Sequence, residues 1–479
     1  MRYIIVSNRL PLRGKPGSNG AIEFTPSIGG LSTGLSSYIK SSNITEYLWI
    51  GWPGIDIEEH EQQNVTDKLL EDFKCVPVFL DRNLEKYYYN GFCNQTLWPL
   101  FHIDPANTKI EAKCWEYYKK ANDLFCDKVM EVFKEGDIIW IHDFHLLMLP
   151  QLIRNKLPNA TIGFFQHIPF PCFDIFKILM STWRSELLQG VLGADFIGFH
   201  INDYVNNFEQ VIARVLRINC DGGRINHQNR LIKYGALPMN IDFKGFSTMA
   251  SSLTVQRKAE QMRSQFYGQK IILSIDRLDY TKGIINKLKG YGNFLKENPQ
   301  QHKKVVLLLI AAPSMRKVKA FDKVKKQVDR LVAEINNSFC TDVWFPVFYD
   351  HKALSVEEMV TIYTVADVAL VTPLRDGMNL IAKEYLASRN DQSGVLILSE
   401  TAGASIELSG AHIVNPFSID DIAESLKIAL EADPFTQMLK NKSMRSRLSR
   451  YNISSWAEDN IKILLKVRED NIVKRLIIN

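Results

Sequence analysis

The stretch Asp367-Val-Ala-Leu-Val-Thr-Pro373, continued by Arg375-Asp-Gly-Met-Asn-Leu-Ile-Ala-Lys-Glu384, decides the fold prediction. Its first part is short, apolar and β-branched, which is typical of a buried parallel strand that ends at a proline. Its second part predicts a helix over Leu380–Ser388, with Asp376 as the N-cap and Gly377 in a tight turn. A strand, a tight loop and a helix in this order indicate a parallel sheet covered by helices.

The loop between this strand and this helix is suited to bind phosphate. The amides of Gly377, Met378 and Asn379 are expected to point outward at the helix N-terminus, where a diphosphate binds well. Leu380 and Glu384 share one helix face, and a carboxylate in that position suits a ribose diol. A capped helix with ordinary salt bridges explains the same residues equally well, so this stretch alone does not decide the function.

The composition is that of a globular protein with small-molecule ligands. The chain has 479 residues, of which 46% are hydrophobic and 23% charged, and its net charge is +5. This length predicts two or three domains. The basic residues are spread along the chain, which favours anionic small ligands over nucleic acid. Seven cysteines without a CxxC pair predict neither a disulfide framework nor a zinc site and fit a reducing cytoplasm. No apolar run is long enough to span a bilayer.

Short apolar strands alternate with helical patterns along the whole chain. Strands are expected at Tyr3–Ser7, Leu48–Trp52, Val76–Leu80, Asp137–Asp143, Thr161–His167, Asp195–His200, Lys270–Asp276, Val305–Ala311, Val343–Phe348, Asp367–Thr372, Gly394–Leu398 and His412–Asn415. Helices are expected at Trp115–Phe133, Leu146–Lys156, Phe173–Met180, Asp203–Leu216, Leu380–Ser388 and Ser418–Ala432. This alternation predicts the α/β class with two doubly wound, Rossmann-like parallel sheets.

The pattern stops and restarts around Leu237–Asp242, which places a domain boundary there. The expected domains are residues 1–238 and 239–455. A C-terminal helix, 456–479, is expected to return to the first domain with an apolar face of Trp456, Ile461, Leu464 and Leu465. Because ligands bind beyond the carboxyl edges of such sheets, two edges facing each other across a cleft are expected to hold two substrates.

Two cations stand at a predicted strand end in the second domain. Arg277 and Lys282 belong to Ile275-Asp-Arg-Leu-Asp-Tyr-Thr-Lys-Gly283. Cations in this position are suited to clamp a diphosphate leaving group and to stabilise the charge that develops as it departs. The alternative is a pair of surface cations bound to Asp276 and Asp279, and the strand-end position favours the functional interpretation.

The first domain also has polar residues after its strands. His142-Asp-Phe-His145 ends one strand and Gly163-Phe-Phe-Gln-His-Ile-Pro-Phe-Pro171 ends another. The two prolines fix the chain after His167, which suits a rigid hydrogen-bond donor to a sugar hydroxyl, although a structural histidine explains it equally well. These histidines and Asp143 lack metal-site spacing, so no metal is predicted. Ser7-Asn-Arg9 offers a guanidinium group to a phosphate.

Glycines and aromatic residues give weaker signals. Gly29 and Gly30 supply a flexible backbone, for which a plain turn is the better explanation. Tyr87–Tyr89, Trp98 and Trp52 lie in loop-like contexts, where core packing is more frequent than stacking on a sugar. The chain has no GxSxG, P-loop or regular GxGxxG motif, so hydrolase, kinase and dehydrogenase functions are poorly supported.

Taken together, these motifs resemble those of the trehalose-6-phosphate synthases, a family of retaining glycosyltransferases with the GT-B fold. The resemblance covers nearly the whole chain. It rests on Ser7-Asn-Arg9, Gly29-Gly-Leu31, Trp49-Ile-Gly-Trp52, Tyr88-Tyr-Asn90, Leu97-Trp-Pro99, Trp140-Ile-His-Asp143, His167-Ile-Pro-Phe-Pro171, Arg277-Leu-Asp-Tyr280, Lys282-Gly283, Ala312-Pro313 with Arg316, and Arg375 to Glu384. It implies transfer of glucose from UDP-glucose to glucose 6-phosphate, with no cofactor.

The resemblance also implies roles for individual residues. The glucose 6-phosphate set is Arg9, Tyr89, Trp98, Asp143 and Arg316. The UDP-glucose set is Gly29, Gly30, His167, Arg277, Lys282, Asp376, Gly377, Met378, Asn379, Leu380 and Glu384. The expected catalytic residues are His167, Arg277, Lys282 and Asp143. The expected partners are these two substrates, with no nucleic acid and no membrane, and a homo-oligomer is left open.

Two departures from the family pattern and two alternatives remain. Asn240 replaces a glycine in the linker, where asparagine tolerates left-handed backbone angles, and Ile201 replaces a frequent threonine. One alternative is a synthase for another phosphorylated acceptor, such as glycerol 3-phosphate. The other is a catalytically silent regulatory subunit, which would be expected to lose Arg277, Lys282 or Glu384. The choice among UDP, GDP and ADP donors is left open.

Overall fold

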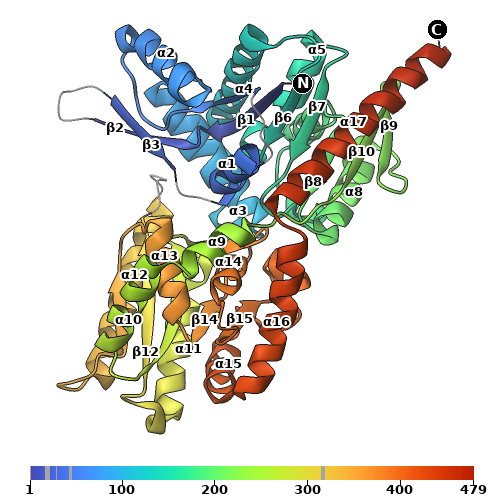
Figure 1. Ribbon diagram of the computed structural model, residues 1–479. Helices are drawn as coiled ribbons and strands as arrows, with labels where there is room; N and C mark the ends of the chain where they lie inside the picture. Colours follow the sequence, from blue (N-terminus) through green and yellow to red (C-terminus); the bar gives the residue numbers. More distant parts are fainter. Residues whose placement is uncertain (1, 17–21, 28–29, 42–45, 314–318, 479) are drawn as a thin grey trace. The chain divides into compact units, whose positions relative to one another are not determined.

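The structure is a computed structural model, and it describes residues 2–16, 22–27, 30–41, 46–313 and 319–478. The chain divides into two compact units (Figure 1). The first unit comprises residues 1–239 and 454–479, and the second comprises residues 240–453. Gly29 and Arg316, two of the predicted site residues, lie outside the described residues.

The first unit is built on an eight-stranded sheet in the order β5-β4-β1-β6-β7-β8-β10-β9. Its strands are β1 (Tyr3–Arg9), β4 (Tyr47–Trp52), β5 (Cys75–Pro77), β6 (Ile138–His142), β7 (Thr161–Phe165), β8 (Phe196–Phe199), β9 (Arg224–His227) and β10 (Arg230–Ala236), and a separate hairpin is formed by β2 (Leu12–Pro16) and β3 (Ile22–Pro26). All neighbouring strands of the large sheet are parallel except β9 and β10, which form an antiparallel hairpin at one edge.

Most helices of the first unit connect these strands in βαβ fashion, and the last one follows the second unit in the chain. They are α1 (Gly30–Ser41), α2 (Gln62–Phe73), α3 (Trp98–Phe101), α4 (Ala112–Val132), α5 (Leu149–Lys156), α6 (Phe173–Phe176), α7 (Ser181–Val191), α8 (Asn202–Leu216) and α17 (Ile453–Ile478), with a π-helical segment, η2 (Leu84–Leu97), and 3₁₀ turns η1 (Glu59–Glu61), η3 (Pro105–Asn107) and η4 (Phe144–Leu146).

The second unit is built on a six-stranded sheet, in the order β13-β12-β11-β14-β15-β16, with parallel neighbours throughout. Its strands are β11 (Lys270–Arg277), β12 (Val305–Ala312), β13 (Val347–Asp350), β14 (Val368–Val371), β15 (Val395–Ser399) and β16 (His412–Val414). Its helices are α9 (Phe243–Ala250), α10 (Leu253–Gln265), α11 (Ile284–Glu297), α12 (Lys319–Phe339), α13 (Val356–Val365), α14 (Leu380–Ser388), α15 (Ile419–Glu431) and α16 (Pro434–Arg450), with 3₁₀ turns η5 (Tyr280–Lys282), η6 (Pro299–Gln301) and η7 (Gly403–Ile406). The predicted α/β class with two doubly wound, Rossmann-like parallel sheets is confirmed.

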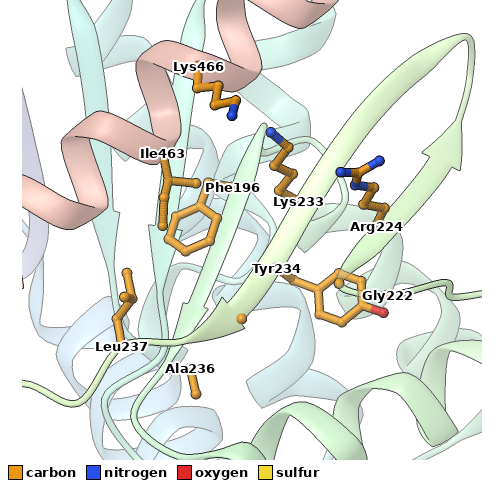
Figure 2. A pocket seen from close by; sticks show the side chains of 11 residues that line it. Phe196, Gly222, Arg224, Lys233, Tyr234, Ala236, Leu237, Ile463 and Lys466 are labelled. Carbon is orange, nitrogen blue, oxygen red and sulfur yellow. The ribbon is translucent and has the colours of Figure 1, made fainter.

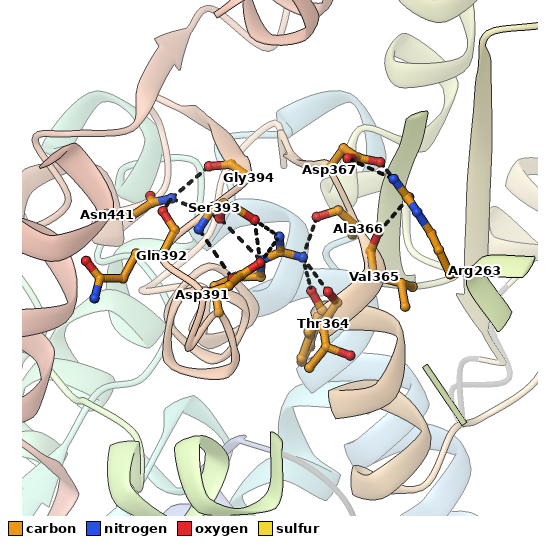
Figure 3. A network of polar contacts seen from close by, with 12 residues as sticks. Arg263, Thr364, Val365, Ala366, Asp367, Asp391, Gln392, Ser393, Gly394 and Asn441 are labelled. Carbon is orange, nitrogen blue, oxygen red and sulfur yellow. Dashed lines mark hydrogen bonds and ion pairs between the residues drawn. The ribbon is translucent and has the colours of Figure 1, made fainter. Parts of the chain in front are cut away.

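A polar network fixes the start of β14 (Figure 3). Arg263 binds both carboxylate oxygens of Asp367, at 2.7 and 3.2 Å. Arg389 donates to the carbonyls of Thr364 and Ala366, at 2.6 and 2.9 Å, which satisfies acceptors at the end of α13. The Asn441 amide donates to three successive carbonyls just before β15. Because these bonds hold both ends of the α13–β14 connection, the loop after β14 begins from a fixed strand.

Helix α17 packs on the sheet of the first unit. Trp456 is fully buried, with ring centroids 5.3 Å from Trp140 of β6 and 5.0 Å from Phe165 of β7. Leu464 lies against Gly163 of β7 so closely that a Cβ there would be 2.7 Å from it. The last helix therefore completes the core of the unit that contains β1.

Replacing Trp456 by alanine is expected to lower the unfolding free energy of the first unit by about 4 kcal/mol, because it leaves a cavity between α17 and the sheet. The measurement is the shift of the denaturant midpoint, with hydrogen exchange of β6 and β7 assigning the loss to this unit. Ile472→Ala is the matched control, since Ile472 is on the same helix but 45% exposed. Equal effects of the two substitutions would contradict the packing.

Several sequence predictions need correction. Helix α5 begins at Leu149, three residues later than predicted, because Pro150 favours the first turn of a helix, and Phe144–Leu146 forms a separate 3₁₀ turn. The predicted helix at Phe173–Met180 ends at Phe176. The strand predicted at Val343–Phe348 is displaced to Val347–Asp350.

The aromatic residues at 87–89 and 98 are not in loops. Tyr87–Tyr89 lie in the π-helical segment η2, and Trp98 begins α3 directly after it. Side chains of this segment bond carbonyls five residues back, as Asn94 does with Tyr89 at 2.7 Å, which supports the wide turns. The segment contains asparagine and glycine and lacks a 3.6-residue apolar period, so the sequence pattern did not indicate a helix.

Asn240 fits the linker for a different reason than the expected left-handed backbone conformation. Its backbone is not in the left-handed region. Its side chain is buried, donates to the Tyr451 carbonyl and accepts from the Ile241 amide at 2.9 Å. The linker therefore depends on the asparagine amide, which a glycine would lack. Within the described part of the chain, no helix is both long and apolar enough to cross a membrane.

Candidate active site

The strand order of each sheet reverses at one point. In the first unit it lies between β1 and β6, which are paired from Tyr3 with Ile138 to Ser7 with His142. In the second unit it lies between β11 and β14. Ligands of doubly wound sheets bind beyond the carboxyl ends of the strands at such points. These points bring Arg9 near Asp143 in one unit and the Lys282 turn near the Asp376 loop in the other.

In the second unit, Lys282 and Asp376 form an ion pair. Lys282 Nζ lies 2.5 Å from Asp376 Oδ2, and the two side chains are 10% and 16% exposed. The other carboxylate oxygen of Asp376 accepts from the Gly377 amide at 3.0 Å, and Oδ2 also accepts from the Asn379 side chain at 3.0 Å. Asp376 therefore fixes the conformation of the loop, and its ion pair holds the Lys282 ammonium group near the N-terminus of α14.

Asp376 is not the N-cap of α14. The N-cap is Asn379, in the left-handed region with φ 68°, and the helix begins at Leu380. Asparagine is among the residues that tolerate this backbone conformation. The Gly377 amide, predicted to point outward, instead donates to Asp376, while Met378 accepts from the Ala404 amide at 2.9 Å.

Two glycines allow the loops to approach each other closely. Gly283, with φ 66°, lies against the Thr372 carbonyl, and a Cβ at Gly403 would collide with the Gly377 carbonyl. The Leu374 amide donates to the Thr281 carbonyl at 2.8 Å. The turn after β11 and the loop after β14 are thus joined by backbone contacts, which leaves little freedom in the position of Lys282. Sequence analysis missed Gly403, although a run of small residues directly after a strand was the available signal.

Glu384 lies one turn inside α14 and accepts from the Tyr363 hydroxyl at 3.0 Å. Burial raises the pKa of Glu384 to about 7, and the bond from Tyr363 opposes the shift in part. A carboxyl group that titrates near neutrality close to a helix N-terminus is a strong candidate for a functional group.

Lys282 pairs with Asp376 and not with Asp276 or Asp279, the partners that the alternative interpretation gave it. Asp276 binds Lys287 at 2.5 Å in a pair that is almost fully buried. Asp279 accepts from the Thr281 amide and hydroxyl, both at 3.0 Å. Arg277 is exposed at the end of β11. The Asp276–Lys287 pair was not foreseen, because its two members stand on a strand and a helix eleven residues apart.

In the first unit, an aromatic box holds Arg9. Its guanidinium carbon lies 4.6 Å from the Trp52 ring centre and 5.0 Å from that of Tyr89, and the two rings meet edge to face at 5.4 Å. A Cβ on Gly54, whose φ is 83°, would be 2.5 Å from an Arg9 nitrogen. Stacking on aromatic faces fixes a guanidinium while leaving its edge to bind an anion.

The segment before Arg9 is fixed as well. Trp49 donates to the Ser7 hydroxyl at 2.8 Å, and that hydroxyl donates to the Arg9 carbonyl at 2.7 Å. Tyr88 donates to the Asn8 side chain at 2.7 Å. The end of β1 is therefore rigid, and the aromatic residues of η2 hold it.

Asp143 follows β6 in a strained backbone conformation. Its φ is 76°, outside the usual range for a residue with a side chain. Its Oδ1 accepts from the His167 amide at 3.2 Å, and its own amide donates to the Phe165 carbonyl at 2.8 Å. Strain of this kind is concentrated at functional sites, and here it joins the ends of β6 and β7.

Three histidines form a row beside Asp143. His142 Nδ1 and His167 Nε2 are 3.0 Å apart, and the His167 and His200 ring centres are 5.3 Å apart. Burial, and to a smaller extent the neighbouring imidazole, lowers the pKa of both His142 and His167 well below the usual value. Both rings are therefore neutral at pH 7, which suits a hydrogen bond with a hydroxyl better than a charge contact.

The remaining predicted residues lie as follows. Trp98 is buried, with its ring centre 4.0 Å from that of His102 and 5.9 Å from that of Phe144. Gly30 begins α1, and Leu380 begins α14. Among the residues that the structure describes, no group of three or more histidine, cysteine, aspartate or glutamate side chains is arranged to hold a metal ion.

Comparisons with known proteins agree along nearly the whole chain. The model of glycosyltransferase family 20 matches residues 1–466. An α,α-trehalose-phosphate synthase (UDP-forming) from Candida albicans is 39% identical, and the match covers 97% of both chains. A crystal structure of such a synthase from Burkholderia xenovorans, in complex with glucose-6-phosphate, has a TM-score of 0.87 and 30% identity, covering 97% of this chain and 100% of that one. An E. coli structure bound with UDP-2-fluoro glucose has a TM-score of 0.86 and 30% identity, covering 97% and 99%.

Proposed function

This chain belongs to glycosyltransferase family 20, and we infer that it transfers glucose from UDP-glucose to glucose 6-phosphate, giving trehalose 6-phosphate and UDP. The reaction is a step of trehalose biosynthesis and retains the configuration at the anomeric carbon. The observation that carries the substrate assignment is that each unit presents fixed cationic groups at its own switch point. One is the boxed guanidinium of Arg9, and the other is the ammonium of Lys282 held by Asp376.

The first unit is proposed to hold the acceptor. Arg9 would bind the phosphate through the edge of its guanidinium group in bidentate fashion. Tyr89 and Trp98 would cover the sugar ring, and Asp143 would accept a hydrogen bond from a sugar hydroxyl. Arg316 is proposed as a second phosphate ligand from its place in the family pattern. The rigidity of the β1 end supports this assignment, because a preorganised site loses little entropy on binding.

The second unit is proposed to hold the donor. Arg277 and Lys282 would bind the diphosphate and neutralise the charge that grows on it as the glycosidic bond breaks. The loop residues Asp376, Gly377, Met378 and Asn379, with Leu380, would surround the nucleotide, and Glu384 would accept from the ribose hydroxyls. Gly29, Gly30 and His167 belong to the first unit and are proposed as donor residues from their place in the family pattern, with neutral His167 bonding a hydroxyl of the transferred glucose.

The cysteines support a cytoplasmic location, which we propose without assigning an oligomeric state. None of the seven forms a disulfide. Burial raises the pKa of Cys75 to about 12, so this thiol is inert. A reducing compartment keeps such thiols unpaired.

The direct test is product identification. The protein is incubated with UDP-, GDP- and ADP-glucose in turn, with glucose 6-phosphate or glycerol 3-phosphate as the acceptor, and the products are separated and identified. Trehalose 6-phosphate with the UDP donor is the expected result. Product only with glycerol 3-phosphate as acceptor would favour the related synthase, and no product with any pair would favour a silent subunit.

UDP binding is expected to release protons between about pH 6 and 7, because a carboxyl whose pKa is near 7 must ionise to accept from the ribose. Below this range the neutral acid dominates and the affinity for UDP falls; above it the affinity is constant. The measurement is titration calorimetry in buffers of different ionisation enthalpy. Glu384→Gln is expected to remove the proton release, and an unchanged release in this variant would contradict the assignment. Glu424→Gln, an exposed carboxylate on α15, is the control.

A further inference from the structure

A cavity of about 310 Å³ lies in the first unit, away from both switch points (Figure 2). It is bounded by β8, the β9–β10 hairpin and the last helix, α17. Its lining residues are Phe196, Gly222, Gly223, Arg224, Lys233, Tyr234, Gly235, Ala236, Leu237, Ile463 and Lys466. None of them belongs to the proposed acceptor or donor sets.

Three cations from three elements border this cavity. Arg224 comes from β9, Lys233 from β10 and Lys466 from α17, and in Figure 2 the amino groups of the two lysines point toward each other. Lys233 pairs with Asp470 at 3.0 Å. Arg224 and Lys466 have no ion-pair partner among the described residues. A second carboxylate, Glu209, accepts from the hydroxyl of the lining residue Tyr234 at 2.6 Å. Three cations against these two carboxylates leave an excess positive charge that attracts anions.

The placement of two of these cations is unfavourable without an anion. Arg224 and Lys233 are directly opposite in the antiparallel register of β9 and β10. Like charges in this position repel each other and destabilise the hairpin. A bound anion between them would convert the repulsion into two attractive contacts.

The floor of the cavity is a glycine within a strand. Gly235 lies inside β10, its φ is not positive, and no atom lies within 4 Å of the position that its Cβ would occupy. Neither backbone conformation nor crowding therefore requires glycine here. Glycine inside a strand weakens it and often marks a place where a ligand approaches the backbone. The open space above Gly235 is continuous with the cationic border.

The opposite wall is apolar. Phe196 and Ile463 face the cavity from β8 and α17, and Leu237 closes its lower end in Figure 2. We propose that this cavity, which we name the α17 pocket, binds a small phosphate monoester. Its phosphate contacts Arg224, Lys233 and Lys466, and its neutral body rests on Gly235 against Phe196 and Ile463. The proposal does not depend on the glycosyltransferase activity.

The test uses phenyl phosphate and inorganic phosphate as probes on the full chain, at ionic strength held constant with chloride. The readout is hydrogen exchange of residues 222–237 and 460–467 as a function of probe concentration. Saturable protection by phenyl phosphate is expected, with weaker binding of inorganic phosphate. Gly235→Leu, which fills the pocket, and Lys466→Glu, at an exposed position, are each expected to weaken binding by roughly tenfold or more.

Lys462→Glu is the matched control, because Lys462 is on the same helix, is 71% exposed and does not line the pocket. Binding that survives in this variant but not in Lys466→Glu supports the proposal. An equal loss in both variants would show only non-specific attraction and would overturn it. Equal affinity for both probes would overturn the monoester assignment, and absence of saturable protection in the unmutated chain would overturn the site itself. Since Lys466 is exposed, its variant gives an answer even where Gly235→Leu fails to fold.

Discussion

Lys282→Ala is expected to lower turnover about a hundredfold, and Arg277→Ala is expected to have a slightly smaller effect. One preorganised charge contact to a leaving group contributes about 3 kcal/mol to the transition state, which corresponds to two orders of magnitude in rate. Lys282 is suited to this role because the Asp376 contact and the backbone bond from Leu374 to Thr281 fix its position before any ligand arrives. The measurement is steady-state kinetics with saturating acceptor.

The control for this prediction is Lys289→Ala. Lys289 stands on α11, the helix that follows Lys282, but its side chain is exposed. It is expected to leave both turnover and the Michaelis constant for the donor unchanged. Near-normal turnover in a folded Lys282→Ala, Arg277→Ala double variant would show that neither cation stabilises the charge on the leaving diphosphate.

Arg9→Ala is expected to reduce kcat/KM for glucose 6-phosphate about a hundredfold, while UDP still binds with its normal affinity. Truncating one member of a partly buried charge pair costs about 3 kcal/mol, much of it from the phosphate left without its partner. Free glucose, which lacks the phosphate, should be a very poor acceptor for the unmutated protein. Both comparisons are made by initial rates, with calorimetry for UDP.

Two further variants separate charge from packing. Arg9→Lys keeps the charge but loses the planar fork and the stacking on Trp52 and Tyr89, so most of the loss should persist. Arg82→Ala removes a cation that is 86% exposed in the same unit and should have no effect. Efficient transfer to free glucose would show that the phosphate site lies elsewhere.

The two sheets could be predicted because their central strands are short runs of buried apolar residues with polar residues on either side. Ile138–His142 and Val368–Val371 are examples, and every residue of both strands is buried. The π-helical segment could not be predicted in this way. Its wide turns are held by side-chain bonds and by burial of ten residues, and neither leaves a regular period in the sequence.

Predictions for the candidate site were better for residue type than for contacts. Arg9, Asp143 and Lys282 were recognised as strand-end residues, which needs only the positions of the strands. The aromatic box around Arg9 joins three separate elements, and the row of His142, His167 and His200 joins three strand ends. Such contacts depend on which strands are neighbours in the sheet, and the order of the strands along the sequence does not reveal this.

The return of α17 affects how the protein is made on the ribosome. Strands β1 to β10 emerge first, but the helix that covers β6 and β7 is translated only after the whole of the second unit. The whole sequence of the second unit has been translated before then, and its two ends are joined by the bond from the Ile453 amide to the Ile241 carbonyl. The unit translated first is therefore the last to finish folding, and during that interval Trp140 and Phe165 offer an uncovered apolar surface to chaperones.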